Sequence, residues 1–172
     1  MNKNALFIIP PDRFNEDELF QPKSLLENSG VKVTIASTKV GEIMGDYQGT
    51  AHAEVTFSEV SSKDYDAIAV IGGSGTIDYL WRNSELTKYL QEAYKQKVLI
   101  TGICAGSVAV VETGLLSGRT ATCYPIDQMI YKLKEHHVEY VTHHVVIHND
   151  IITSDGPEGA KEFGEALVKA IG

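Results

Sequence analysis

The residues with the clearest chemical potential stand where an apolar run ends in the pattern Gly102-Ile103-Cys104-Ala105-Gly106. A nucleophile between two glycines, each two residues away, is typical of a sharp strand-to-helix turn. The central residue of such a turn is held in a strained backbone conformation, and larger flanking residues would collide with their neighbours. Free amides and the helix dipole at the start of the following helix stabilise a thiolate. The pattern therefore predicts that Cys104 is a nucleophile with a lowered pKa, the alternative being a cysteine that only fills core space.

Two main-chain N–H groups are expected near the Cys104 sulfur. One belongs to Ala105, the residue after the nucleophile. The other belongs to Gly73, in the glycine turn Gly72-Gly73-Ser74-Gly75 after a predicted buried strand. Loops at the carboxyl ends of parallel strands gather at one edge of a sheet, so both groups can form an oxyanion hole. A tight turn without catalytic duty is the alternative for the glycine segment, which lacks the spacing of a nucleotide-binding loop.

The loop after the first predicted strand delivers carboxyl groups to the first turn of the first helix, where one of them could have a role in the site. Glu16, Asp17 and Glu18 all stand there. Acidic residues are common at this place because they complement the helix dipole. The residues alone leave the choice among the three open.

The apolar periodicity predicts strands alternating with helices, which is typical of a mostly parallel sheet covered on both faces. With 172 residues, we expect one doubly wound α/β domain spanning 1–172. The expected strands are 5–9, 31–37, 66–71, 98–103 and 120–123, with further strands near Val138, Val145 and Ile151; the expected helices are 16–28, a helix through Leu86, Leu90 and Tyr94, 106–113, 126–135 and 159–171; a short antiparallel excursion is expected within 47–60.

Composition limits the class of partner and the compartment. A net charge of −8 argues against nucleic acid and anionic membranes, which would repel the chain. No apolar stretch is long enough to span a membrane and no signal peptide is recognisable, so a cytoplasmic protein is expected. In a reducing compartment, Cys104 and Cys123 are not expected to form a structural disulfide.

Histidines are concentrated in the last third of the chain, where five of the six occur. Adjacent histidines point to different sides of a strand or helix, and no ligand-spacing motif is present, so no metal site is expected. Whether one of these imidazoles reaches Cys104, within the chain or across a dimer, stays open. The five are His136, His137, His143, His144 and His148.

Several segments together resemble the DJ-one/PfpI superfamily over nearly the whole chain. Gly73 and Cys104 also have the spacing expected for that family. The resemblance implies a flavodoxin-like three-layer sandwich, a homodimer, and a Cys104 thiolate hydrogen-bonded by a protonated Glu18. The matching segments are Glu18-Leu19-Phe20-Gln21-Pro22, Ile71-Gly72-Gly73, Ile103-Cys104-Ala105-Gly106, Thr122-Cys123-Tyr124-Pro125 and Thr153-Ser154-Asp155-Gly156-Pro157.

Three positions separate branches of the superfamily. Peptidase-like members carry histidine where this chain has Ala105, so an adjacent general base is missing and the deglycase-like branch fits better. Tyr124 stands where that branch has histidine, and Asp155 replaces its usual arginine, which would alter the dimer surface or the charge of the pocket. Tyr124, Gly72 and Pro157 are expected to line the pocket.

The resemblance implies a cysteine-dependent enzyme without cofactor that acts on small reactive carbonyls, as a glutathione-independent glyoxalase or protein deglycase. Its substrate would be a small aldehyde or a glycated molecule. A redox-sensing or chaperone-like protein, oxidised at Cys104 without turnover, is the alternative. A cysteine peptidase or hydratase with a base from His136 to His148 is a third hypothesis.

Overall fold

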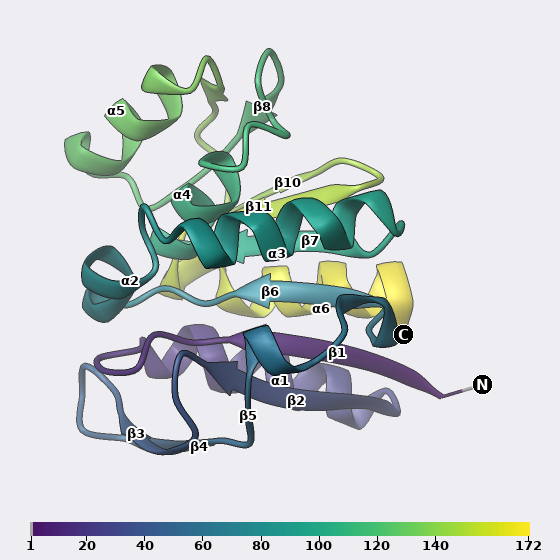
Figure 1. Ribbon diagram of the computed structural model, residues 1–172. Coiled ribbons are helices and arrows are strands. Elements are labelled where there is room, and N and C mark those ends of the chain that lie inside the picture. Colours follow the sequence, from purple (N-terminus) through teal and green to yellow (C-terminus); the bar gives the residue numbers. More distant parts are fainter. Residues whose placement is uncertain (1) are drawn as a thin grey trace.

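The computed structural model describes residues 2–172, with a seven-stranded sheet through its centre (Figure 1). All neighbouring strands are parallel except for one pair at an edge of the sheet, which is antiparallel. From one edge to the other the sheet runs β10 (Val145–Ile147), β11 (Ile151–Ser154), β7 (Leu99–Ile103), β6 (Ala67–Val70), β1 (Lys3–Ile8), β2 (Val31–Ser37) and β5 (Val55–Thr56).

Helices cover both faces of this sheet, which is why every residue of the central strands β6 and β7 is buried. On one face α1 (Glu16–Asn28) and α6 (Ala160–Ile171) pack against each other, at the rear in Figure 1. On the other face lie α3 (Ser84–Lys95) and α4 (Ala105–Val111), with α2 (Ser74–Tyr79) and α5 (Asp127–Glu135) packed on α4. The doubly wound three-layer α/β fold expected from the sequence is confirmed.

The predicted antiparallel excursion is present but begins earlier than expected. It is a hairpin of β3 (Gly41–Met44) and β4 (Thr50–Ala53), so its first strand precedes residue 47. The chain then joins the central sheet through β5 and continues in two short 3-10 helices. These are η1 (Phe57–Glu59) and η2 (Ser62–Asp64).

Only two residues of the segment predicted as a strand at 120–123 form one, and this strand does not join the central sheet. Only β8 (Thr120–Ala121) forms, and it pairs with β9 (Glu139–Tyr140) in a separate two-stranded sheet. The chain leaves the extended pairing before Pro125, which has no N–H for a further ladder bond. A third 3-10 helix, η3 (Pro157–Gly159), leads into α6.

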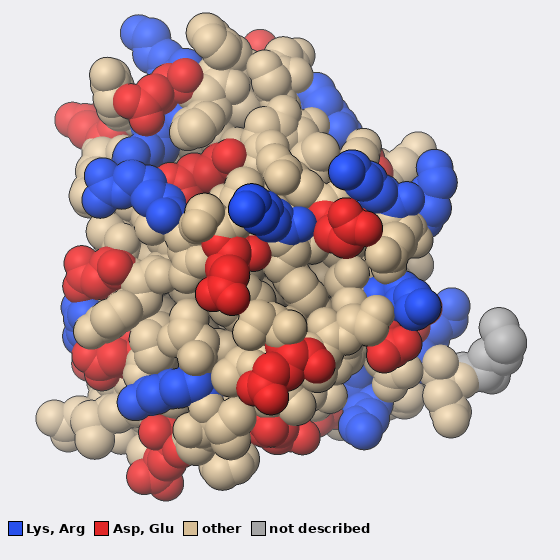
Figure 2. All heavy atoms as spheres, in the orientation of Figure 1, with Lys and Arg blue, Asp and Glu red and all other residues tan. Residues whose placement is uncertain are grey.

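Charges of both signs are interspersed over the face that carries α3 (Figure 2). This face therefore presents no continuous basic surface of the kind that binds nucleic acid. Within residues 2–172, no helix is both long and apolar enough to cross a bilayer.

Candidate active site

The sharp turn predicted around Cys104 is present between β7 and α4. Cys104 has φ 61° and ψ −124°, a backbone conformation that residues other than glycine rarely adopt. A Cβ atom on Gly102 would lie 2.6 Å from the carbonyl oxygen of Gly106, and one on Gly106 would overlap the carbonyl oxygen of Val70. Close packing of β6, β7 and α4 therefore holds the nucleophile in its strained position, with 7% of the Cys104 surface exposed.

The N–H groups of Gly73 and Ala105 both lie near Cys104 and lower the pKa of its thiol. Ala105 begins α4, and Gly73 is the residue before α2. Gly73 has φ +122°, and a Cβ atom there would lie 2.6 Å from the main-chain nitrogen of Asn15. Only glycine lets this turn pass between the loop after β1 and the nucleophile. The structure thus brings both predicted donors to the sulfur.

Glu18 is the carboxylic acid that reaches Cys104. It is fully buried, its Oε1 accepts a hydrogen bond from the Gly72 N–H at 2.9 Å, and its carboxyl group lies close enough to Cys104 for each group to shift the pKa of the other. Its Oε2 has no nitrogen or oxygen partner within residues 2–172. The other two candidates serve elsewhere: Glu16 accepts from main-chain amides of the β3–β4 turn, and Asp17 is exposed.

The side chain of Asn15 fixes where Glu18 stands. Asn15 precedes α1 and its Oδ1 accepts a hydrogen bond from the Glu18 N–H at 3.1 Å. This cap begins the helix at Glu16, as the sequence predicted, and it satisfies an amide that would otherwise lack a partner. The capped first turn places the Glu18 carboxyl group against Gly72, which also packs against Cys104 Cβ.

Burial is the main cause of the raised pKa of both Glu18 and Cys104. It raises the pKa of Glu18 to about 8, so Glu18 keeps its proton at neutral pH. Burial also raises the pKa of the Cys104 thiol, and an ionised Glu18 raises it further, whereas the N–H groups of Ala105 and Gly73 lower it. The expectation of a lowered pKa from the helix start alone is therefore wrong, because burial, the largest contribution, does not depend on the charge of Glu18. With Glu18 protonated the repulsion is absent, and its O–H can donate to the sulfur.

Glu18 should make the free energy of unfolding depend on pH. The folded protein holds this proton up to about pH 8, whereas an unfolded chain releases it near the ordinary value of 4.5. Stabilisation from the buried proton is complete below that ordinary value and is lost as the pH rises through the folded-state value. Between the two, stability should fall by about 1.4 kcal/mol per pH unit for one proton. Urea unfolding from pH 5 to 8 should show this slope in wild type, whereas Glu18→Gln should lack it. Parallel profiles for the two proteins would contradict the assignment.

A small pocket of about 260 Å³ lies beside the nucleophile. A Cβ atom on Gly156 would lie 2.9 Å from the ring of Tyr124 and 3.7 Å from the Cβ of Cys104, so Gly156 separates the pocket wall from the nucleophile. Gly72, in contrast, packs directly against Cys104 and Glu18 and does not line this pocket. The lining residues are Tyr124, Pro125, Asp155, Gly156, Pro157 and Glu158.

The histidines of the last third find other partners. The Nδ1 of His144 lies 2.8 Å from Asp155 Oδ2, and this contact raises the pKa of His144. The Nε2 of His148 lies 2.9 Å from the carbonyl oxygen of Thr120. Within residues 2–172, no hydrogen bond joins a histidine to Cys104, and no three His, Cys, Asp or Glu side chains are grouped to hold a metal ion. Cys104 and Cys123 are both free thiols.

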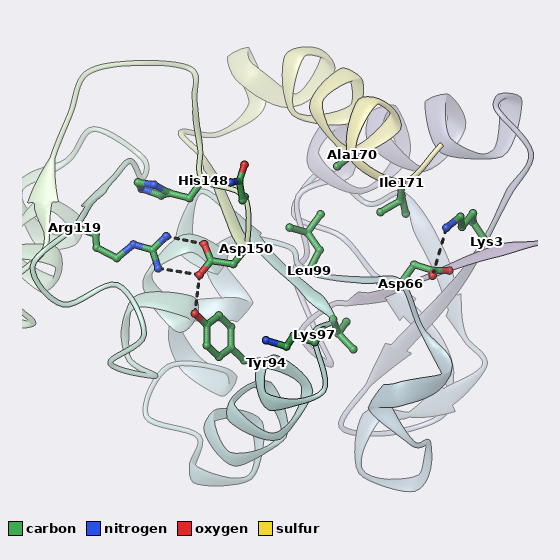
Figure 3. A pocket seen from close by; sticks show the side chains of 12 residues that line it. Lys3, Asp66, Tyr94, Lys97, Leu99, Arg119, His148, Asp150, Ala170 and Ile171 are labelled. Carbon is green, nitrogen blue, oxygen red and sulfur yellow. Dashed lines mark hydrogen bonds and ion pairs between the residues drawn. The ribbon is translucent and has the colours of Figure 1, made fainter.

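A larger cavity of about 800 Å³ lies at the amino ends of the central strands, whereas Cys104 follows the carboxyl end of β7 (Figure 3). Arg119 binds both carboxylate oxygens of Asp150, at 2.6 and 3.1 Å, and the Tyr94 hydroxyl donates to the same carboxylate at 2.6 Å. This network lowers the pKa of Asp150, chiefly through the Arg119 hydrogen bonds. It ties α3 to the segments before β8 and β11, and it is remote from the nucleophile.

The sequence model of the DJ-1/PfpI family matches residues 3–170. The chain belongs to this family. The match includes the strained cysteine, the buried glutamate and the two glycine turns that the structure brings together.

Named relatives and a solved structure agree with this assignment. An uncharacterized protein of Methanocaldococcus jannaschii is 35% identical over 99% of this chain and 83% of its own length. A deglycase of Pyrococcus abyssi is 28% identical over 96% of this chain and 98% of its own length. A glutathione-independent glyoxalase of Caenorhabditis elegans is 27% identical over 98% and 89%. The crystal structure of a ThiJ/PfpI domain protein from Brachyspira murdochii superimposes with a TM-score of 0.92 and 26% identity, covering 97% of this chain and 95% of that one.

Proposed function

We propose that this protein is a cysteine-dependent enzyme that acts on small reactive carbonyls, as a glutathione-independent glyoxalase or a deglycase. The observation that carries the proposal is the contact of one strained cysteine, Cys104, with a buried acid and two main-chain donors. The relatives from Pyrococcus abyssi and Caenorhabditis elegans, which bear these two activities in their names, support it. The substrate class is a small aldehyde or a glycated molecule.

The reaction with methylglyoxal begins with addition of the Cys104 thiolate to the aldehyde carbon. A carbon–sulfur bond forms and the carbonyl electron pair moves onto oxygen, where the N–H groups of Gly73 and Ala105 stabilise the negative charge. Glu18 supplies the proton that neutralises this oxygen and gives a hemithioacetal.

The second stage is an internal redox change without a cofactor. Glu18, now ionised, removes the hydrogen of the former aldehyde carbon as a proton and returns a proton to the neighbouring carbon, while the hydroxyl proton of the hemithioacetal passes to the oxygen of that neighbouring carbon. The former aldehyde carbon is oxidised to a thioester while the former ketone carbon is reduced to an alcohol. Water then hydrolyses the thioester, which releases lactate and regenerates the Cys104 thiol.

The proposal is tested by supplying the purified wild-type protein with methylglyoxal in buffer without glutathione. Lactate should accumulate in an amount equal to the methylglyoxal consumed. Absence of lactate, or lactate formation only when glutathione is added, would overturn the proposed activity.

A redox-sensing protein is the second candidate, because the site is also built to hold an oxidised sulfur. Cys104 retains some exposure whereas Cys123 has none, so peroxide reaches only the first of the two thiols. Two peroxide molecules would convert the thiolate to a sulfinate and release two waters. The protonated Glu18, whose Oε2 lacks a nitrogen or oxygen partner, can then donate to a sulfinate oxygen.

Mild peroxide should therefore add two oxygen atoms to Cys104 and leave Cys123 unmodified. Mass spectrometry of the digested protein measures both sites in one sample. Cys104→Ser, the matched control, should gain no oxygen at either position. Equal oxidation of both cysteines in the wild-type protein would contradict a sensing role.

Peptidase or hydratase activity has less support, because Cys104 is followed by Ala105 and its hydrogen-bonding partners include no imidazole. The homodimer implied by the family and the cytoplasmic location expected from composition belong to the same proposal. A mass in solution equal to one 18.8 kDa chain would contradict the dimer.

A further inference from the structure

The only tryptophan of the chain contacts the residue next to the nucleophile. Trp81 lies in the loop between α2 and α3 with 7% of its surface exposed. Its indole Nε1–H donates to the carbonyl oxygen of Ala105 at 2.8 Å, in a buried hydrogen bond. Ala105 is also the residue whose own N–H faces the Cys104 sulfur. The indole therefore holds one of the two residues that donate to the nucleophile.

The same tryptophan is bonded to the segment that supplies the other donor. The carbonyl oxygen of Thr76, in α2, accepts from the main-chain N–H groups of Leu80 at 2.9 Å and of Trp81 at 3.0 Å. The Thr76 hydroxyl is buried and donates at 2.8 Å to the carbonyl oxygen of Ile71, two residues before Gly73. Buried hydrogen bonds thus connect the Gly73 turn, through Thr76 and Trp81, to Ala105.

Two further contacts lie next to this bond, one at the residue after Trp81 and one beside its ring. Arg82, the next residue, has φ +55° and its N–H donates to the Glu112 carboxylate at the end of α4 at 2.9 Å. The Nζ of Lys132, in α5, lies 5.7 Å from the centre of the Trp81 ring, within the range of a cation–π contact. The direction of the indole N–H is set by its bond to the Ala105 carbonyl oxygen, and the Lys132 cation beside the ring takes no part in that bond.

We propose that Trp81 is a positioning residue, which sets the separation of the Gly73 and Ala105 N–H groups around the Cys104 sulfur. The inference rests on the proposed function in taking Cys104 as the reacting group. Without the indole bond the first residue of α4 is free to shift, and the hydrogen bond from its N–H to the thiolate weakens. The alkylation rate of Cys104 at pH 7 should then fall about three- to tenfold, as expected for the weakening of one hydrogen bond to a charged group.

Because Trp81 is the only tryptophan, replacing tryptophan during biosynthesis changes a single site. The analogue 3-benzothienylalanine keeps the shape of the ring system and puts sulfur in place of the N–H. In a Cys123→Ala background, only Cys104 remains to be alkylated by iodoacetamide. The analogue protein should show the slower rate at pH 7 and a pH profile whose midpoint lies higher than that of the tryptophan protein. Trp81→Phe should move the profile in the same direction.

Lys132→Met is the matched control, since it removes the cation beside the ring and leaves the indole bond intact. Its alkylation profile should coincide with that of the parent protein. A profile for the analogue protein that also coincides with the parent would overturn the inference, even if the midpoint of thermal unfolding were lower. Alkylation does not require turnover, so failure to convert methylglyoxal would refute the proposed activity without affecting this comparison.

Discussion

Cys104→Ala should reduce lactate formation from methylglyoxal to the uncatalysed rate, a loss of at least about a thousandfold. The carbon–sulfur bond of the first step cannot form without the thiol, and no other nucleophile in the described residues contacts Glu18 and both N–H donors. Lactate measured over time at pH 7, with equal concentrations of folded protein, gives the two rates.

Cys123→Ala is the control for this comparison. Cys123 has no exposed surface, so methylglyoxal cannot reach its thiol, whereas Cys104 retains some exposure. This variant should keep the wild-type rate. A Cys104→Ala protein that still forms lactate at more than a few per cent of the wild-type rate would show that another group performs the reaction.

Gly106→Ala should destabilise the fold by about 3 kcal/mol, because the new methyl group would overlap the carbonyl oxygen of Val70 and lie 3.2 Å from the carbonyl carbon of Ile71. Both atoms belong to a central, fully buried segment, so neither can move aside without disturbing the sheet. For a chain of this size, the loss corresponds to a decrease in the thermal midpoint of roughly 6–12 °C.

Gly114→Ala provides the comparison within the same region. Gly114 follows α4 with φ +83°, and a Cβ atom there would have nothing within 4 Å. Its cost is limited to the left-handed backbone, about 1 kcal/mol. Equal losses for the two variants would mean that the tight approach of α4 to β6 does not determine the cost at Gly106.

The sequence predicts elements well where local signals are complete. Both ends of helix α1 agree with the prediction of 16–28, and the structure gives a local cause for each: Asn15 caps its start, and Gly30, with φ +91°, follows its end. Helix α2 was not predicted, since Gly73 precedes it without a capping side chain and the helix has only six residues. The pairing of β8 with β9 outside the central sheet could not be predicted, because the sequence pattern of a strand does not reveal which strand it pairs with.

In the site too, features that depend on nearby residues can be predicted from the sequence, whereas features that depend on distant residues cannot. The turn at Cys104 follows from its glycines, whose spacing is visible in the sequence. Glu18 could not be separated from Glu16 and Asp17 without the family resemblance, because their roles depend on which side of α1 meets the sheet. The pKa of Cys104 could not be predicted from the helix start, since burial by distant residues outweighs the nearby amides. Nothing in the sequence around Trp81 indicates that its indole N–H bonds to the carbonyl oxygen of Ala105.

The turn between β3 and β4 is hydrogen-bonded to two segments that lead to the site around Cys104. Its amides at Tyr47 and Gly49 bind the Glu16 carboxylate, and Asp46 accepts from the N–H of Ser74 at 2.9 Å. Glu16 stands two residues before Glu18, and Ser74 is the residue after Gly73. Shortening or lengthening this outlying turn should consequently displace both Glu16 and Ser74, and through them the groups that surround the sulfur.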